Sequence, residues 1–472
     1  MAIDDVSLNK PIEEPKPPRF HFGPALLVTA AFIGPGTVLT ASKAGANYGF
    51  SLVWAVIFSI LATVVLQEMA ARLGIISGRG LAQAIRDSIS NPFGRYLSLG
   101  LVLGAILIGN AAYQTGNLLG AAIGLAELLP AEPSSEKVLD ASTHSNSISS
   151  EAIAALFGAI ALVIIWIGRL GIVQAIMFAL VGLMSLMFVL SAIACRPDWA
   201  AVCAGAVPSI PTGESWNDMS LFVIGLLGTT VVPYNLFLHA SSAAETWHSS
   251  AQAQGNQKRI LRASMWDTVI SVLVGGIVTG SILITMSVAF SDSQVELTQT
   301  TQIADQLRSA LGSWAGILFA VGLCAAGLTS SITAPIAAAY ATAGCFNWPC
   351  KLSDVRLKLV ASLVVVTGVI AAVSAGKSPM QVIILAQFAN GLLLPLVAIF
   401  LVYVANQAKL MGKFKNSWLA NALAVLVIVI TISIAFGNLN GAIGKLKKMM
   451  TPEQTSSQTE SAVYSLTRSG RG

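Results

Sequence analysis

Charged residues are scarce in this sequence, and their scarcity argues against a soluble fold. Only 10% of the 472 residues are charged, whereas 55% are hydrophobic, and the mean hydropathy is +0.74. One soluble core cannot hide that much apolar surface, so lipid is expected to solvate much of the chain. The composition therefore predicts an integral membrane protein.

Cysteine and histidine are also rare, which leaves little material for catalysis or for a resident metal. The cysteines have no metal-ligand spacing, and we expect them to be small packing residues; they are Cys195, Cys203, Cys324, Cys345 and Cys350. The sequence has no phosphate-binding loop and no Ser-His-Asp arrangement, so it predicts no enzyme, no ATP-driven pump and no cofactor. The net charge of +5 is spread over short loops, which argues against a nucleic-acid partner.

Long hydrophobic runs, in contrast, recur along the whole chain. A helix of about 20 apolar residues crosses the roughly 30 Å of hydrocarbon in a bilayer. The runs predict an all-α membrane domain over residues 23–436 with about eleven transmembrane helices. The expected ranges are 24–49, 51–73, 96–126, 151–168, 171–195, 219–246, 264–290, 313–346, 358–376, 379–405 and 417–436.

The two ends of the chain are polar. Residues 1–22 are rich in proline and lack the apolar centre of a signal peptide, so we expect a disordered cytoplasmic tail. Residues 437–472 are expected to form a C-terminal tail.

Basic residues mark one side of the predicted topology. Loops that follow even-numbered helices carry most of them, and the opposite loops carry few. Cytoplasmic loops of membrane proteins are enriched in lysine and arginine, so the N-terminus is expected inside. The inner set is Arg72, Arg79, Arg86, Arg95, Arg169, Lys258, Arg259, Arg262, Lys351, Arg356, Lys358, Lys409, Lys413 and Lys415.

Two of the predicted helices are interrupted near their centres. The stretch 34–37 breaks the first, because Pro35 removes an amide donor and glycine at Gly36 removes side-chain constraint. The stretch 231–235, centred on Pro233, breaks the sixth. A lone proline is usually a kink, but two breaks at equivalent places in two five-helix halves indicate an inverted repeat.

The two halves cover about residues 24–195 and 219–405, and the odd number of helices in each inverts the second half. The helix at 417–436 follows them. This arrangement is a leucine-transporter-like fold with a 5+5 inverted repeat plus an eleventh helix. Free carbonyls at such breaks bind cargo near the bilayer midplane in secondary transporters.

The residues around both breaks resemble a known family. The stretch 34–54 resembles the first-helix signature of the Nramp (natural resistance-associated macrophage protein) metal-ion transporters, usually Asp-Pro-Gly-Asn followed by an Ala-Gly-Ala and Gly-Tyr run. Pro233, Asn235 and His239 resemble its sixth-helix signature, Met-Pro-His-Asn-Leu-x-Leu-His. The resemblance extends from helix one to helix ten. It implies a divalent-metal transporter that works by alternating access, in the bacterial inner membrane.

The sequence departs from the family at the metal ligands. In the family, the first-helix Asp and Asn and the sixth-helix Met ligate the metal, whereas the aligned residues here are Gly34, Thr37 and Val232. The anionic ligand and the soft sulfur are both missing, and a thioether is what selects softer metals.

Neutral oxygen is what remains at the predicted site. We expect the cargo to meet the Gly34 and Thr229 carbonyls, the Thr37 hydroxyl, and the amides of Asn235 and Gln387. Such a set can hold a hard, partly hydrated cation weakly, or it can hold no metal.

The proton pathway implied by the family is altered too. Gln114 and Asn117 occupy the positions of its third-helix Asp-x-x-Glu pair, and amides do not titrate in the useful range. Tyr234 replaces a sixth-helix histidine, while His239 remains one turn later. Asn110 and Tyr113 share a helix face with Gln114 and Asn117. That face is expected to look into the bundle, either as helix–helix hydrogen bonds or as a hydrated path.

Several other polar residues are expected to be structural. Glu68 precedes Arg72 by the spacing of an ion pair on one helix face. Asp267 and Asp354 lie at predicted inner helix ends, where they cap or pair. The hydroxyl of Ser330 is expected to bond to a backbone carbonyl.

Three functions stay open from the sequence. The first is an Nramp-like secondary transporter of divalent cations such as manganese, iron or magnesium, with an altered, uncharged site. The second is a same-fold transporter of a small neutral or zwitterionic solute, and the third is a non-transporting membrane sensor. The lipid bilayer surrounds the protein in each case, and the sequence leaves the oligomeric state open.

Overall fold

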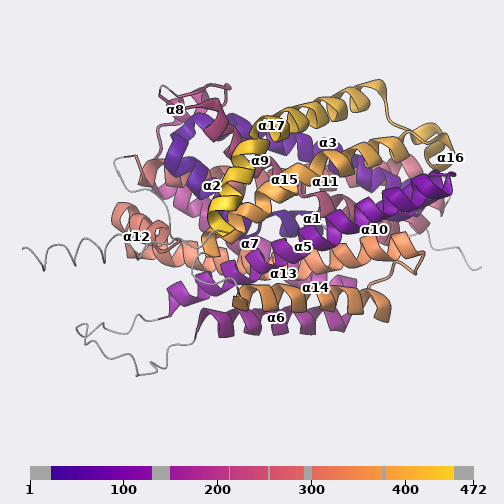
Figure 1. Ribbon diagram of the computed structural model, residues 1–472, viewed down its shortest axis with the longest axis horizontal. Coiled ribbons are helices and arrows are strands. Elements are labelled where there is room, and N and C mark those ends of the chain that lie inside the picture. The colour runs from indigo at the N-terminus through magenta and orange to yellow at the C-terminus, as the bar shows by residue number, and fades with distance from the viewer. Residues whose placement is uncertain are drawn as a thin grey trace, which may run out of the picture.

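The apolar runs of the sequence fold into helices that lie roughly along one direction (Figure 1). The structure is a computed structural model that describes residues 23–129, 149–211, 213–253, 256–291, 300–374 and 379–450. Over these residues it contains helices and no strand. The predicted N-terminal tail, 1–22, lies outside the described residues.

The first half of the fold contains five membrane crossings, of which the first is split. They are α1 and α2 (Pro24–Phe32, Pro35–Tyr48), α3 (Val53–Ser77), α5 (Pro92–Leu128), α6 (Ser150–Ile167) and α7 (Leu170–Ala194). The second half repeats this order with α9 and α10 (Trp216–Thr230, Pro233–Gln252), α11 (Gln257–Ala289), α13 (Ser313–Phe346), α14 (Val355–Ser374) and α15 (Pro379–Ala405). Short helices α4 (Leu81–Ser88), α8 (Trp199–Ala204), α12 (Thr300–Leu311) and α16 (Ala408–Met411) connect them, and α17 (Trp418–Met450) follows.

Eleven crossings result once one long stretch is divided. In the described part of the chain, nine helical stretches are long and apolar enough to span a membrane, or ten with the bent pair that ends at Ile434. One of the nine, Pro35–Ser77, has 43 residues, which is about 65 Å of helix and roughly twice the hydrocarbon thickness. It turns at Gly49, whose φ of 55° suits glycine. Helix α2 therefore completes the crossing that α1 begins, α3 is a separate one, and the predicted fold class is confirmed.

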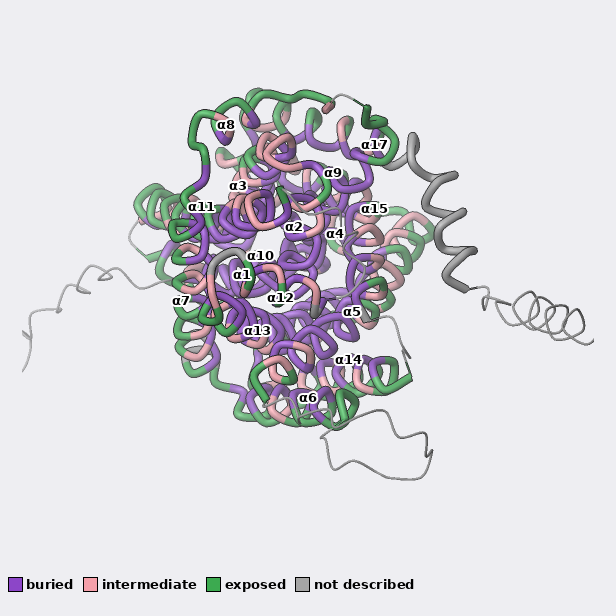
Figure 2. The backbone as a smooth tube through the Cα atoms, turned by 90° about the vertical axis from the view of Figure 1, so that its left-hand side faces the viewer, coloured by how far each residue is buried: buried purple, intermediate pink, exposed green. Residues whose placement is uncertain are grey.

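Close contacts between backbones hold the two halves together. A Cβ on Gly74 of α3 would lie 2.1 Å from the Ala240 carbonyl oxygen of α10. A Cβ on Gly327 of α13 would lie 2.6 Å from the Ala121 nitrogen of α5. Small residues let membrane helices approach in this way. The broken helices α1, α2 and α10 consequently lie in the buried centre of the bundle (Figure 2).

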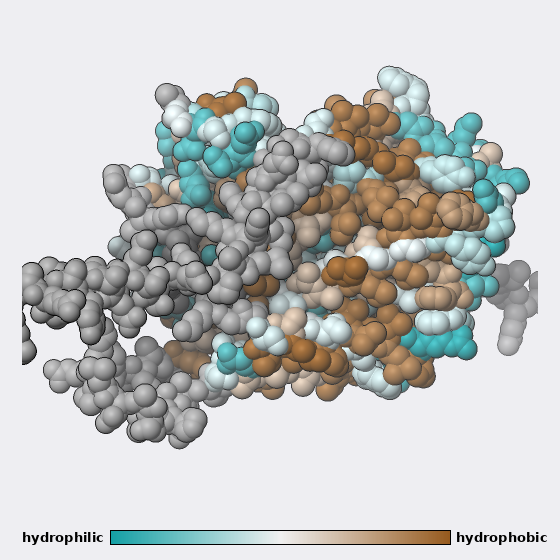
Figure 3. Space-filling view, in the orientation of Figure 1, coloured by the Kyte–Doolittle hydropathy of each residue, from teal (hydrophilic) through white to brown (hydrophobic). Residues whose placement is uncertain are grey.

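The outer surface of the bundle is apolar where it faces lipid. Large side chains such as Ile108 and Val163 are 74% and 64% exposed. In Figure 3 hydrophobic residues form a broad band over the visible face, and hydrophilic residues gather at the right-hand end. This band accounts for the high hydropathy of the sequence.

The last helix differs from its prediction. Helix α17 was expected over 417–436, but it continues to Met450. Residues 437–472 were expected to form a tail, and the first of them include glycines and asparagines, which are weak helix formers. The strong helix formers that follow them continue the helix.

The prediction that the cysteines are packing residues fits Cys195 and Cys345, which are buried, but not Cys203, which is exposed. All five are free, including Cys195 and Cys203. Burial raises the pKa of the Cys350 thiol to about 11, so this thiol stays protonated at neutral pH.

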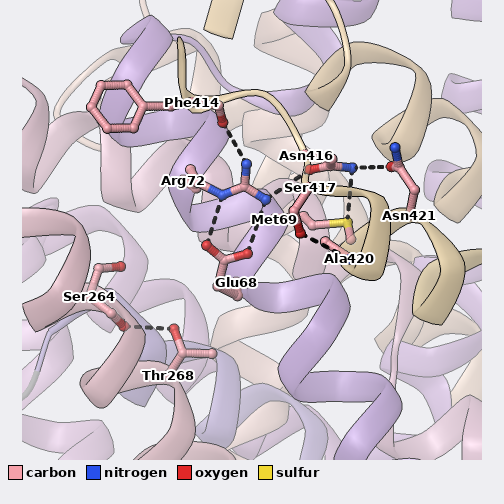
Figure 4. A network of polar contacts seen from close by, with 10 residues as sticks. All are labelled: Glu68, Met69, Arg72, Ser264, Thr268, Phe414, Asn416, Ser417, Ala420 and Asn421. Atoms are coloured by element: carbon pink, nitrogen blue, oxygen red, sulfur yellow. Dashed lines mark hydrogen bonds and ion pairs between the residues drawn. The ribbon is translucent and has the colours of Figure 1, made fainter. Parts of the chain in front are cut away.

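The predicted pair of Glu68 and Arg72 is confirmed, and it belongs to a larger network (Figure 4). Arg72 donates to both carboxylate oxygens of Glu68, at 2.8 and 3.1 Å. It also donates to the Phe414 carbonyl at 2.6 Å and to the Asn416 side-chain oxygen at 2.8 Å. A single guanidinium thus ties α3 to the segment that leads into α17.

We predict that Arg72→Ala lowers the free energy of unfolding by about 1–3 kcal/mol, because it leaves the carboxylate and two oxygens of the loop without their donor. Chemical unfolding in mixed micelles measures the change. Arg79→Ala is the control, since Arg79 forms a more exposed ion pair with Asp87. An Arg72→Ala effect no larger than that of Arg79→Ala would show that the network contributes nothing to stability.

Candidate functional site

The first helix break lies between Phe32 and Pro35. Helix α1 ends at Phe32, Gly34 adopts an extended conformation with φ −106° and ψ 179°, and Pro35 is the first residue of α2. The Ile33 amide bonds to the Thr29 carbonyl at 3.1 Å. The carbonyls of Ala30, Ala31 and Phe32 then follow without amides of a continuing helix to bond them.

The second break has the same design. Helix α9 ends at Thr230, and Pro233 begins α10 after an interruption at Val231 and Val232. The Val231 amide bonds to the Leu227 carbonyl at 2.8 Å. Proline fits the start of a helix because its missing amide has no partner there in any case.

The two breaks meet at a pair of threonine hydroxyls. The Thr37 and Thr229 hydroxyl oxygens lie 2.5 Å apart, although 192 residues separate them in the sequence. The Thr37 hydroxyl also bonds to the Phe32 carbonyl, so it bridges the break of its own helix. One side chain thereby joins α1, α2 and α9.

Gln387 of α15 completes one wall of this region. A Cβ on Gly36 would lie 2.0 Å from the Gln387 side-chain nitrogen, so Gly36 makes room for the amide. A Cβ on Gly228 of α9 would lie 2.3 Å from the Gln387 carbonyl oxygen, so this glycine also allows a close approach. The glycines thus bring both broken helices against α15.

The predicted cargo residues form a closed, polar interior. Thr37, Thr229, Val232 and Asn235 are fully buried and Gln387 is 2% exposed. In the described part of the chain, the side-chain oxygens of Asn235 and Gln387 have no hydrogen-bond partner. Buried amide oxygens normally have one, so these two are open acceptors.

The polar face of the third predicted helix does turn inward. Asn110, Gln114 and Asn117 of α5 are at most 1% exposed. The Gln114 amide donates to the Ser331 carbonyl at 3.1 Å, while Asn110 lines a pocket with Tyr234 and Asn390. Both side-chain polar atoms of Asn110 lack a partner among the described residues.

His239 lies one helical turn beyond the second break, in a neutral environment. Its Nδ1 is 3.0 Å from the Gln67 side-chain oxygen of α3, and the histidine is fully buried. Its Nε2 has no partner in the residues described. The structure thus places His239 against α3, away from the threonine pair.

The sequence did not indicate that Tyr113, Tyr234 and Ser330 meet at one point. Tyr113 of α5, Tyr234 of α10 and Ser330 of α13 all donate to the Ala31 carbonyl. For Ser330, the expected bond to backbone exists, but it reaches another helix. Tyr113 did lie on the predicted polar face, which was the only signal in the sequence for it.

Asp267 and Asp354 have the predicted capping roles. The Asp267 carboxylate accepts from the Gly23 and Ala25 amides at 2.9 and 3.1 Å, so it caps α1. Asp354 accepts from the Arg356 amide at 2.8 Å at the start of α14. Neither carboxylate belongs to the interior between the breaks.

The chemistry available between the breaks is therefore that of neutral oxygen. Over the described ranges, no group of three or more His, Cys, Asp and Glu side chains could hold a metal ion. Hydroxyl, amide and carbonyl oxygens are hard ligands, suited to hard cations or to hydrogen-bonding solutes.

Comparison with known proteins agrees with this architecture. The sequence profile of the family described as natural resistance-associated macrophage protein-like (Nramp) matches residues 25–439. A divalent metal cation transporter of Pseudomonas aeruginosa, MntH 1, is 31% identical over 414 residues, which cover 85% of this chain and 87% of the relative. A relative with the same description from Brucella suis is 28% identical and covers 89% of each chain.

Solved structures share the fold. The manganese transporter of Eremococcus coleocola in complex with an aromatic bis-isothiourea compound superposes with a TM-score of 0.73 at 21% identity, over 99% of this chain and 96% of that one. The nucleobase-cation-symport-1 family transporter Mhp1 gives a TM-score of 0.56 at 17% identity, over 89% of each chain.

The fold and the paired helix breaks define an inverted-repeat membrane transporter scaffold. Within that class, the chain belongs to the Nramp family.

We predict that Thr37→Val and Thr229→Val each lower the free energy of unfolding by about 1 kcal/mol, because each removes a buried hydrogen bond. The two effects share one bond, so the double variant should lose less than their sum, by about 0.5 kcal/mol or more. Unfolding in mixed micelles gives the values. Thr230→Val is the control, since its hydroxyl bonds to the Leu226 carbonyl of its own helix. Fully additive effects would contradict a direct contact between the two threonines.

Proposed function

We propose that this protein is an Nramp-type secondary transporter that moves divalent metal cations by alternating access through an uncharged site. One observation carries the proposal: the open amide oxygens of Asn235 and Gln387 are buried beside two interrupted helices that touch at Thr37 and Thr229. Broken helices at the centre of an inverted repeat are where such transporters hold cargo. The family membership and the divalent-cation descriptions of its relatives favour a metal.

The expected cargo is a hard cation held weakly. Without a carboxylate, a fully dehydrated dication near the membrane centre would be strongly destabilised. The thioether that favours softer metals is also absent, because Val232 occupies the start of α10. Neutral oxygens suit a cation that keeps part of its hydration shell, such as magnesium.

The proposed orientation places the N-terminus in the cytoplasm, in a bacterial inner membrane. The start of α1 lies beside Asp267 near the start of α11, and His248 near the end of α10 contacts Ile75 near the end of α3. These ends adjoin the basic residues Arg79 and Lys258 in the sequence. A shared basic end supports an inside location for it.

A second function is favoured by the lack of charge at the breaks. Asn235, Gln387, Thr37 and Thr229 provide hydrogen-bond donors and acceptors without a counter-ion for a cation. A small neutral or zwitterionic solute would use them equally well. This candidate is an outcome of the experiment that follows.

Uptake by vesicles that contain only this protein tests the proposal. We expect uptake of Mg²⁺ or Mn²⁺, and we expect Asn235→Ala or Gln387→Ala to reduce it about tenfold, as for the loss of a partner that orients a metal. Gln252→Ala is the matched control, because this amide lies at the exposed end of the helix that carries Asn235.

Each outcome decides between the functions. Absence of uptake for both cations would contradict the proposal, and uptake of a labelled neutral amino acid in its place would establish the second function. Equal uptake by Asn235→Ala, Gln387→Ala and Gln252→Ala would move the cargo site away from the helix breaks.

A further inference from the structure

The end of α1 presents backbone acceptors that no amide of its own helix satisfies. Carbonyls at a helix C-terminus carry partial negative charge and attract cations. Ala30, Ala31 and Phe32 contribute them here, directly before the break. A dehydrated cation would bind these oxygens first, unless something else occupies them.

Neutral hydroxyls occupy all three carbonyls. Ser330 donates to Ala30 at 3.5 Å, and Thr37 donates to Phe32. The Ala31 carbonyl receives three donors: Ser330 at 3.2 Å, Tyr234 at 3.3 Å and Tyr113 at 3.4 Å. We call Tyr113, Tyr234 and Ser330 the hydroxyl clasp. Its members come from α5, α10 and α13, and two of these helices, α10 and α13, flank α1 (Figure 2).

The hydroxyl clasp holds its carbonyl loosely. A carbonyl oxygen has two lone pairs, yet three hydroxyls donate to the carbonyl oxygen of Ala31. All three distances exceed the length of about 2.8 Å that is common for O–H···O bonds. Tyr113 also hydrogen-bonds with Tyr234 and with Ser330, so the three hydroxyls share the Ala31 carbonyl and cover it at little gain in stability.

Gly34 is what allows the clasp to form. A Cβ at this position would lie 2.6 Å from the Ser330 hydroxyl oxygen and 3.1 Å from that of Tyr113. A side chain at Gly34 and the hydroxyl clasp would compete for one space. The absence of a side chain at Gly34 and the presence of the hydroxyls are thus two parts of one arrangement.

We propose that the hydroxyl clasp determines cation specificity by covering the α1 carbonyls, so that a cation is held by amide and hydroxyl side chains and not by the helix end. This inference rests on the proposed function as a cation transporter. In this proposal Tyr113, Tyr234 and Ser330 do not bind the cation but keep it away from the α1 carbonyls. Their removal should strengthen cation binding, whereas removal of ligands would weaken it.

Equilibrium binding of Mn²⁺ and of Mg²⁺ to the full-length protein in lipid nanodiscs, followed by titration calorimetry, tests the clasp. The double variant Tyr113→Phe/Tyr234→Phe keeps both rings, which pack edge to face at 5.3 Å between centroids. We expect it to bind Mn²⁺ about fivefold more tightly than the wild type. The reason is that the Ala31 carbonyl loses two donors and can bind the cation, a change about as large as one hydrogen bond. Tyr340→Phe is the control, because that buried hydroxyl donates to Glu245 and not to α1.

A gain of affinity in the double variant but not in Tyr340→Phe supports the proposal. Binding that is unchanged or weaker in the double variant overturns it and makes the hydroxyls merely structural. Ser330→Ala removes a smaller group and gives the same test if the tyrosine variants do not fold. Cation uptake by wild-type vesicles tests the proposed function separately. A wild type that transports no cation, with a variant that gains cation binding, would refute the function and support the clasp.

Discussion

Peptide groups inside a bilayer must be hydrogen-bonded within the protein, because lipid supplies no partner. In this protein two helices are interrupted inside the bundle, so some of their peptide groups need hydrogen-bond partners outside their own helix. Each interrupted helix leaves carbonyls that no amide of its own helix can reach. Side chains of α2, α5, α10 and α13 satisfy the carbonyls at the end of α1, so this break ties elements of both halves together. The two interrupted helices also contact each other directly, through the Thr37 and Thr229 hydroxyls.

The positions of the helix breaks and the chemistry beside them are determined by different residues. Proline and glycine at the breaks determine where open backbone groups appear, and they do so whatever the cargo is. Side chains determine what is bound there. Here every group between the breaks is neutral, so charge compensation for a cation must come from its own water or from weak neutral ligands. Membership of the Nramp family is therefore compatible with neutral side chains beside the two breaks.

The sequence predicted the features that depend on local chemistry. Pro35 and Pro233 revealed the interruptions because they lie at equivalent places in the two halves. Proline alone would not have been enough, since Pro335 and Pro395 lie inside the continuous helices α13 and α15. The spacing of Glu68 and Arg72 revealed their ion pair. The inward face of α5 followed from helical periodicity alone.

Contacts between distant segments were not predictable from the sequence. Nothing in the pattern around Tyr113 or Ser330 indicates that both reach the Ala31 carbonyl, because that meeting depends on the packing of three helices. The acceptors Asn235 and Gln387 were identified, but that their oxygens are left open is a property of the folded interior. The predicted membrane span 417–436 agrees with the apolar stretch Trp418–Ile434, whereas the continuation of α17 to Met450 was not predicted.

Disulfide formation in the bilayer tests the central claim, the meeting of both breaks, most directly. The pair Thr37→Cys and Thr229→Cys, introduced together into a variant without the native cysteines, should link rapidly under mild oxidation, as mass spectrometry of the digested protein would show, because the two side chains are in contact. Pairing Thr37→Cys with Thr230→Cys should link poorly, since the Thr230 hydroxyl bonds within α9. Failure of the first pair to link in intact vesicles would contradict the account, because the two interrupted helices would then not meet.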